Sequence, residues 1–416
     1  MNNSLKKIYA QQRQKSLLKY FVISLCLVAL LSTSASAAVW LFDPTVTLSQ
    51  EYDDNYRLAP SSSNEDEVST TRLSGELALK GKSERLDVKA ILNLDAINYS
   101  GDDDNLDDRN NQSVRLTSAY RATERNSLSL RGNYFRDTIV RTTQSLFLPD
   151  DDIPFDPDQD VDVNLVRDDA RRTRFRISPG WNYRLSESTS LGLGYQYNDL
   201  SFSGEDTNSG LVESEQQGIS ANISRRVTEK DKVSVSISET YFRPDNDRDV
   251  DTLQARLGWV HKFSESFEMN FTVGGRDSDF DNAQKSSDSG FVGNIGATKR
   301  TGRTTYRINI EQRENPSSSG NQVEVDEINV DIEHAITEKL TFSFEGRFFD
   351  TETTDDSNSN SNREYISFEP RLSWRFLPSW VAGAGYQYSE EDLDDGGSGD
   401  SNAAFVNISW SPPRQF

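Results

Sequence analysis

Apolar and polar residues alternate with a period of two along most of the chain from about residue 44 onward. The clearest runs lie at 86–94, 233–237, 267–273 and 340–344. A period of two is typical of β-strands, whereas amphipathic helices repeat every 3.6 residues. Whole runs extend over about 9–11 residues, which is the length of a tilted strand that crosses a bilayer. The alternation therefore predicts an all-β protein.

Two kinds of connection alternate between these runs. One kind is short and often begins Ser/Thr-Glu, with centres near residues 83, 124, 187, 229, 264, 301, 337 and 378. The other is long and rich in Asp, Ser, Asn and Gly, with examples at 53–67, 100–112, 137–172, 199–214, 277–289, 350–363 and 389–402. Most short turns follow one another at about 40 residues, which leaves room for one hairpin each. This pattern predicts a transmembrane antiparallel up-and-down β-barrel, with short periplasmic turns and long acidic extracellular loops.

The strand count follows from the turns. Two strands around each of the eight short turns, with one near 44–52 and one at 403–411, give 18 strands, and 16 to 18 is the range we expect. An even count is usual for such barrels. The strand expected at 323–334 is irregular, because Val323 and Val325 do not share parity with Ile328 and the alternate residues after it. We expect a β-bulge there.

The N-terminus has the order of a secretory signal. Residues 1–19 carry five Lys or Arg and no acid, an apolar stretch occupies 21–31, and Ala35-Ser36-Ala37 closes the segment. This order predicts a signal peptide at 1–37 for Sec-type export, and a single barrel domain at 38–416. An N-terminal membrane anchor is the alternative, but the apolar stretch is short for a spanning helix. Cys26, the single cysteine, would leave with the signal.

Composition excludes several other classes. The chain has 67 acidic and 45 basic residues, a formal net charge of -22, and a mean hydropathy of -0.71. Such a chain is neither a helical membrane protein nor a basic nucleic-acid binder, and one cysteine excludes a disulfide scaffold. An aromatic content of 10% argues against an acidic disordered chain. Removal of the five positive charges of the signal takes the charge of the remaining chain to -27.

Tryptophan positions favour a membrane barrel over a soluble one. Five of them lie near a short turn or near the C-terminus, namely Trp181, Trp259, Trp374, Trp380 and Trp410. Short turns and chain ends face the periplasm in outer-membrane barrels, so these residues would form a periplasmic aromatic girdle. The alternative is that aromatic residues merely favour strands, but this alternative predicts no bias toward one end.

The opposite parity of each strand would line the lumen, and it carries many charges. The arginines that we predict there are Arg115, Arg121, Arg131, Arg174, Arg176, Arg256, Arg307, Arg347 and Arg371. A basic surplus in a narrow pore favours anions. In the alternative, opposite charges pair between neighbouring strands and simply fill the interior. The longest loop, 137–172, is the segment that we expect to fold inward as a constriction.

Neither catalysis nor a confident metal site is expected. Asp156, Asp158 and Asp160 alternate in the longest loop and form a weak Ca²⁺ candidate, although a solvated acidic loop is the favoured interpretation. The invariant glycine of an EF-hand is replaced by Val161. The two histidines, His261 and His334, fall at the lipid-facing parity near short turns, where a general base has no role. We therefore expect no enzyme and no cofactor.

The start of the predicted barrel carries a resemblance. The segment 42–60, with Glu51-Tyr52-Asp53-Asp54-Asn55 before a Ser-rich loop, resembles outer-membrane β-barrel proteins of the β-barrel porin type found with exopolysaccharide and PEP-CTERM/exosortase loci. The match covers about 20 residues. It implies a bacterial outer-membrane pore with a role in polysaccharide export and no catalytic residues.

The resemblance and the barrel pattern also imply partners. These are outer-membrane lipid and lipopolysaccharide, the barrel-assembly machinery, and a polysaccharide, with no nucleic acid. Phe416 looks like the terminal aromatic signal of barrel assembly, although Pro412 and Pro413 interrupt the strand before it. Two functions remain open at this point. One is a passive porin-like channel, and the other is a non-conducting structural or assembly barrel that presents acidic loops.

Overall fold

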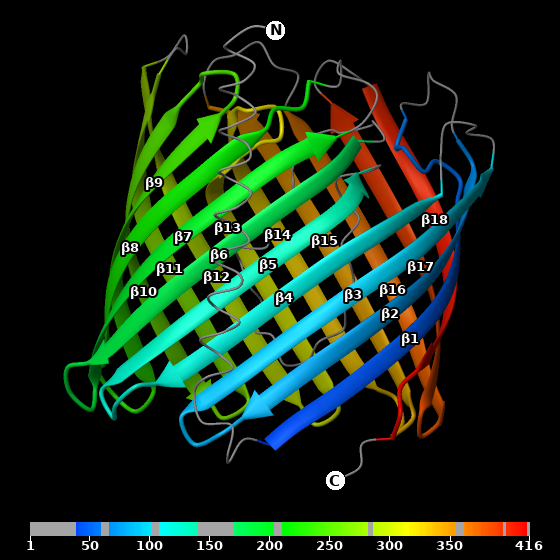
Figure 1. The fold of residues 1–416 in the computed structure, drawn as a ribbon, viewed down its shortest axis with the longest axis horizontal. Coiled ribbons are helices and arrows are strands. Elements are labelled where there is room, and N and C mark those ends of the chain that lie inside the picture. Colours follow the sequence, from blue (N-terminus) through cyan, green and yellow to red (C-terminus); the bar gives the residue numbers. More distant parts are fainter. Residues whose placement is uncertain are drawn as a thin grey trace, which may run out of the picture.

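The computed structural model describes residues 39–59, 66–101, 108–139, 170–203, 210–281, 286–354, 362–393 and 397–413. Within these residues, 18 β-strands form one closed antiparallel sheet (Figure 1). The strands are β1 (Val39–Asp53), β2 (Val68–Lys82), β3 (Leu86–Gly101), β4 (Arg109–Arg121), β5 (Asn126–Ile139), β6 (Ala170–Arg184), β7 (Thr189–Ser203), β8 (Ser214–Arg226), β9 (Asp231–Pro244), β10 (Val250–Ser264), β11 (Phe267–Phe280), β12 (Ser287–Thr301), β13 (Thr304–Pro316), β14 (Gln322–Ala335), β15 (Leu340–Thr353), β16 (Arg363–Leu377), β17 (Trp380–Leu393) and β18 (Gly397–Trp410).

Each strand pairs with its neighbours in sequence, and β1 also pairs with β18, which closes the barrel. The predicted all-β up-and-down barrel of 18 strands is thus confirmed. The strands are longer than expected, at 13 to 16 residues. They continue beyond the apolar alternation into the polar ends that carry the long loops, so the alternation alone underestimated their length.

A hydroxyl group closes most of the short turns. In six turns the side-chain oxygen of a Ser or Thr accepts backbone N–H groups two or three residues later, namely at Ser83, Thr123, Ser186, Thr228, Ser264 and Thr337. Thr228 Oγ1, for example, accepts from the amides of Lys230 at 3.1 Å and Asp231 at 2.9 Å. This local bonding replaces the ladder where the chain reverses. It explains why the Ser/Thr-Glu signature located the turns.

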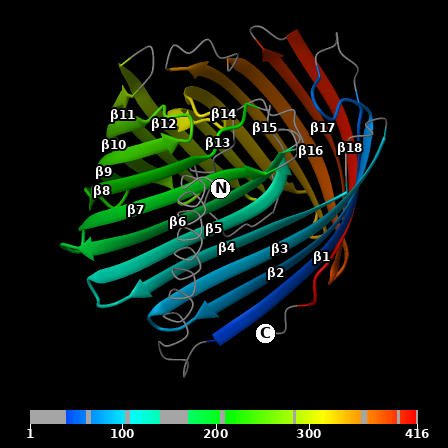
Figure 2. The same ribbon diagram turned by 45° about the horizontal axis from the view of Figure 1, so that its top comes forward.

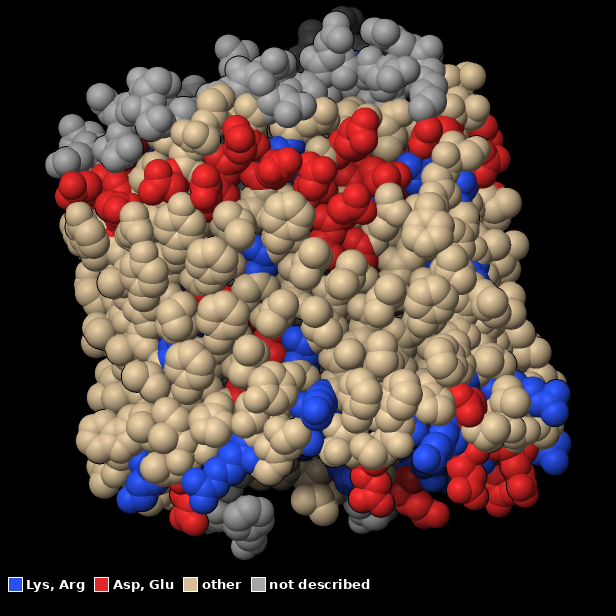
Figure 3. Space-filling model, turned by 180° about the vertical axis from the view of Figure 1, so that it is seen from behind, with Lys and Arg blue, Asp and Glu red and all other residues tan. Residues whose placement is uncertain are grey.

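All eight short turns lie at one rim of the barrel, together with the start of β1 and the end of β18 (Figure 1). Above this rim, outward-facing apolar side chains surround the barrel. Val235, Ile237 and Leu257 are each about half exposed, with 51–54% of their surface accessible. Figure 3 shows this belt with few charged side chains, an acidic band at the long-loop rim, and most of the Lys and Arg at the short-turn rim. A continuous exposed apolar belt matches a lipid environment rather than water.

The bulge predicted within 323–334 is wrong. Strand β14 pairs with β13 and β15 without any shift of register. Val323 and Val325 face the barrel interior, where they are fully buried beside Phe349 and Tyr365. The apolar residues change parity there because the interior itself becomes apolar at that height. The described register shifts lie instead near short turns, at 262–264 and 374–377.

Several predicted features fall outside the described residues. They are the signal peptide at 1–37, Phe416, the aspartates 156, 158 and 160, and the greater part of the loop 137–172. Among the residues that the structure does describe, no helix has both the length and the hydropathy needed to span a membrane.

Candidate functional site

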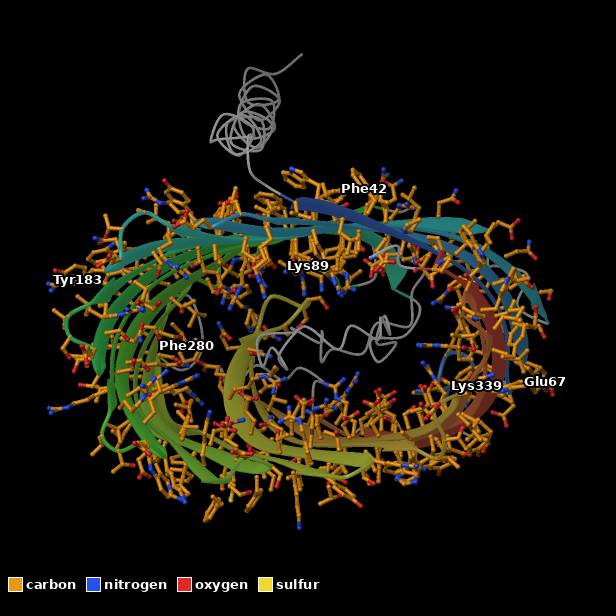
Figure 4. The ribbon with its side chains drawn as sticks, turned by 90° about the horizontal axis from the view of Figure 1, so that it is seen from below. Phe42, Glu67, Lys89, Tyr183, Phe280 and Lys339 are labelled. Atoms are coloured by element: carbon orange, nitrogen blue, oxygen red, sulfur yellow. The ribbon has the colours of Figure 1, made fainter. Side chains whose placement is uncertain are left out.

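The inner surface of the barrel is the candidate site, and the strand parity defines it. Each of the nine predicted lumen arginines lies at the parity opposite to the exposed apolar residues of its strand. Arg115, for example, lies between the outward-facing Val114 and Leu116, and its register partners are Ile91 and Asn133. Figure 4 shows Lys89 and Phe280 on the inner side of the wall and Phe42 and Tyr183 on the outer side. The arginines are thus placed on the inner face, but they are not distributed evenly around it.

One part of the inner face is strongly basic. The inward parity of β4, β5 and β6 carries eight arginines, which we call the basic wall, namely Arg109, Arg115, Arg121, Arg131, Arg172, Arg174, Arg176 and Arg184. Among the described residues of these three strands, Asp137 is the single acidic side chain, and Arg172 binds it with 2.7 and 3.1 Å hydrogen bonds. Among the described residues of these three strands, the inward-facing side chains therefore have a strongly positive formal charge balance.

The opposite part of the inner face holds charges of both signs. Strand β14 is nine positions from β5 in the ring of 18, and Figure 1 shows β13–β15 behind β4 and β5. Five arginines of β13–β16 form ion pairs here, and we call this surface the paired wall. Glu327 accepts from Arg313 at 2.7 Å and from Arg347 at 2.8 Å. Arg371 binds Glu369 at 2.7 Å, and Arg307 binds Asp331.

The predicted lumen arginines therefore fall on different walls. Arg307, Arg347 and Arg371 belong to the paired wall, where opposite charges fill the interior. Arg115, Arg121, Arg131, Arg174 and Arg176 belong to the basic wall. Arg256 lies on β10, between the two walls, with Gly274 and Ser236 as its register partners. The alternation along each strand does not show which strands face each other across the ring, so this segregation could not be predicted from the sequence.

The hairpin of β13 and β14 leaves the wall and folds into the barrel. The ladder between β12 and β13 ends at Gly293 and Gln312, whereas β13 and β14 stay paired to Pro316 and Gln322. Glu314 then crosses over β12: its carboxylate lies 3.1 Å from Arg276 Nη1 and accepts from Ser278 Oγ at 2.8 Å, both on β11. Figures 2 and 4 show this part of the ribbon inside the ring of strands.

The tip of this hairpin docks on loops from other strands. The amide of Val212, after β7, donates to the carbonyl oxygen of Ser318 at 2.7 Å. Arg248, between β9 and β10, donates to Asn321 Oδ1 at 2.7 Å. Gly320 has a φ of 81°, and a Cβ there would lie 2.6 Å from Asn246 Nδ2. We call residues 313–322 the inner hairpin. The segment expected to fold inward, 137–172, lies largely outside the described residues, and the inner hairpin is a further inward-folding segment that was not predicted.

The five predicted girdle tryptophans all lie near the short-turn rim on the outer parity. Trp374 is 54% exposed and Trp259 is 43% exposed, while Trp380 and Trp410 lie directly opposite each other on β17 and β18. Trp181 donates through Nε1 to Asn126 Oδ1 at 3.2 Å. Trp40, which sequence reasoning set aside, lies at the same rim on β1, and its ring covers Gly81.

The described residues offer no metal-binding group of three or more His, Cys, Asp or Glu. The weak Ca²⁺ candidate, Asp156, Asp158 and Asp160, cannot be compared because it lies outside them. Both histidines lie near the short-turn rim. His261 Nδ1 is 2.7 Å from Asp231 Oδ1, and His334 Nδ1 is 2.8 Å from Thr304 Oγ1. Their contacts join neighbouring strands at the short-turn rim.

Comparison with known proteins by sequence gives nothing: no family model and no curated protein matches the chain. Solved structures do match in overall fold. Acinetobacter baumannii OccAB4 is 10% identical with a TM-score of 0.47, covering 91% of this chain and 99% of that one. Pseudomonas aeruginosa OccK7 (OpdD) is 12% identical with a TM-score of 0.47, at 90% and 100% coverage. The outer membrane channel DcaP of Acinetobacter baumannii is 14% identical with a TM-score of 0.41, at 91% and 99%.

Proposed function

We propose that this protein is a passive outer-membrane channel, not an enzyme, and that small hydrophilic solutes cross it beside the basic wall. The observation that carries the proposal is the segregation of charge across the barrel. Eight inward arginines and one aspartate lie on β4–β6, opposite a wall where arginines and carboxylates pair. A barrel of this strand number is wide enough to hold water. Its interior field therefore favours anions on one side.

The size of this preference follows from simple electrostatics. One positive charge about 10 Å from a monovalent anion in water lowers the energy of the anion by about 0.4 kcal/mol. Several arginines act together along the basic wall, whereas the ion pairs of the paired wall largely cancel each other at a distance. The summed attraction concentrates anions on the basic side and repels cations from it.

The outer surface supports placement in the outer membrane. The apolar belt, the tryptophans near one rim and the acidic band at the other match a barrel between a lipid core and two aqueous sides. We propose that outer-membrane lipid and lipopolysaccharide contact this surface after Sec-type export and insertion by the barrel-assembly machinery. Passage of an exopolysaccharide is a finer proposal, supported by the resemblance of residues 42–60 and by the affinity of a basic wall for acidic sugars.

Planar-bilayer recording of the purified, folded barrel tests this function. We expect discrete openings and a reversal potential in a KCl gradient with the sign of anion preference. Block of the current by an acidic polysaccharide, and not by a neutral one of equal length, would support the finer proposal. Absence of any opening from folded protein would leave the non-conducting structural barrel as the better description.

A further inference from the structure

We propose that Asp53, Asp54 and Asn55 form a lock that holds residues 54–59 inside the barrel mouth, where they and the inner hairpin make a fixed cap over the paired wall. The lock is made by the part of the chain that shows the family resemblance. The consequence for transport rests on the proposed channel function, but the lock and the cap can be tested separately from it.

The lock strengthens a short seam. Strands β1 and β18 share eight register pairs, from Val46 and Trp410 to Asp53 and Ala403, whereas β1 and β2 share fifteen. Just above the last pair, side chains continue the contact between the two ends of the chain. Ser401 Oγ donates to Asp53 Oδ1 at 2.7 Å, and the Asn402 amide donates to Asp54 Oδ1 at 2.7 Å.

Asn55 turns the chain inward after the seam. Its Oδ1 accepts from the amide of Ala59 at 2.8 Å, and its Nδ2 donates to the carbonyl oxygens of Ala59 at 2.9 Å and Asp400 at 2.8 Å. Asn55 therefore fixes both the closed shape of 55–59 and its place beside β18. Gly399 permits the close approach, because a Cβ there would lie 2.5 Å from the carbonyl oxygen of Ala59. Asn55 is 2% exposed, so these polar groups have no solvent to replace their partners.

This turn carries Leu58 away from the seam between β1 and β18 to the inner face of β14–β16. Leu58 has a φ of 50°, which a non-glycine residue adopts only when its surroundings fix it. Its side chain is buried in one apolar cluster with Val323, Val325, Phe349 and Tyr365 from β14, β15 and β16. An apolar cluster on the inner face of a barrel with a charged interior marks a packed contact. The first extracellular segment thus meets the base of the inner hairpin.

A buried ion pair holds the other half of the cap. Arg276 and Glu314, at 1% and 3% side-chain exposure, join the inner hairpin to β11, and Thr252 Oγ1 of β10 donates to Glu314 at 3.3 Å. Arg363 of β16 binds Glu391 of β17 at 3.0 Å within the wall, and it lies 4.9 Å from the centre of the Phe349 ring. The cap therefore rests on the paired wall through apolar contacts, and the ion pair of Glu314 joins it to the neighbouring strand β11. It closes that side of the mouth and directs solutes toward the basic wall.

Engineered disulfides test the cap without any transport measurement. Leu58→Cys is combined with Val323→Cys or Val325→Cys in a chain with Cys26→Ser, which then has no other cysteine. We expect at least one pair to form a cross-link rapidly upon mild oxidation of the folded barrel. Asn55→Ala in the same background should slow the cross-link about tenfold, because 55–59 loses its closing bonds. Asp279→Asn, an exposed carboxamide change at the same rim, should leave the rate unchanged.

Heat-modifiable migration on a gel shows whether each variant still forms a barrel. If Asn55→Ala does not fold, Asp54→Asn replaces it, since this change weakens only the bonds to Asn402. Absence of both cross-links in folded protein would overturn the cap. Equal cross-linking rates with and without Asn55→Ala would overturn the lock.

Single-channel conductance tests the consequence for transport. Replacement of 317–321 by two glycines, together with Leu58→Gly, should raise conductance about twofold because a side of the mouth opens. An unchanged conductance would overturn the confining role of the cap and leave the channel intact. Openings only in the altered protein would support the cap as a plug and contradict a passive channel. Openings in neither would contradict the channel, and the cross-links would still decide the lock.

Discussion

The two opposite walls of this barrel differ in how many carboxylates accompany their arginines. On β13–β16, Arg313 and Arg347 share Glu327, and Arg371 binds Glu369, so that charge contributes to packing. On β4–β6, eight inward arginines accompany one aspartate, so that charge creates a field across the lumen. The same residue type at the same parity thus has a structural role on one side, and we propose a transport role for it on the other. The net charge of a whole lumen therefore does not describe the charge balance at any one group of strands.

The largest difference between the walls should appear in stability. Glu327→Gln leaves Arg313 and Arg347 buried without their shared carboxylate, and loss of one partner from a buried ion pair costs about 3–5 kcal/mol. Glu352→Gln, the same change on the exposed outer parity of β15, should stay within about 0.5 kcal/mol. Urea unfolding in lipid vesicles measures both. Similar losses for the two variants would show that the paired wall does not depend on its ion pairs.

The next effect concerns permeation along the basic wall. Replacement of Arg131, Arg174 and Arg176 by Ala removes three positive charges, each of which contributes about 0.4 kcal/mol at about 10 Å in water. The barrier for a monovalent anion should rise by about 1.2 kcal/mol, which lowers anion permeability about eightfold. Arg125→Ala, in the exposed β4–β5 turn, is the control. Unchanged reversal potentials in the triple variant would mean that anions do not pass beside this wall.

A smaller change should make the basic wall resemble the paired wall. Thr117 lies directly opposite Arg131 on β5 and Lys89 on β3, so Thr117→Glu places a carboxylate between two cations. We expect the unfolding free energy to rise by about 0–1 kcal/mol and anion permeability to fall about twofold. The two measurements should move in opposite directions. A loss of stability with no change in permeability would contradict the assignment of this wall to the solute path.

Ionic strength gives the mildest test, because it changes no residue. The Debye length falls from about 30 Å at 0.01 M salt to about 3 Å at 1 M. Anion preference from the basic wall should therefore be strong at low salt and nearly absent at 1 M. The ion pairs that Glu327 makes on the paired wall are largely buried and should keep their stabilising effect over the same range. A preference that persists at 1 M would indicate a narrow binding site rather than a field.

Much of the barrel could be predicted because its information is local. The alternation gives parity, and the hydroxyl that caps each short turn is part of a recurrent Ser/Thr-Glu signature. The inner hairpin could not be predicted in this way, because Glu314 finds Arg276 across a strand that separates them in the ring. The sequence contains one sign of the inner hairpin. The change of parity at Val323 and Val325 marks the place where the interior becomes apolar, but the same change also predicts a β-bulge.

The tyrosine-aspartate-asparagine segment shows the same limit. Residues 51–55 were visible as a motif, but their bonds to Ser401 and Asn402 join the two ends of the chain. No local pattern contains such a contact. The segregation of the walls was also hidden, since it depends on which strands face each other after closure of the ring.

The reversal potential of the unmodified barrel in a KCl gradient tests the central claim most directly. The measurement uses one channel at low total salt, where the field of the basic wall extends across the lumen. The segregated walls predict a potential on the chloride side of zero, which moves toward zero when Arg131, Arg174 and Arg176 are replaced. A potential on the potassium side of zero would contradict the basic wall as the path of the solutes. A potential that does not change when these arginines are replaced would contradict it as well.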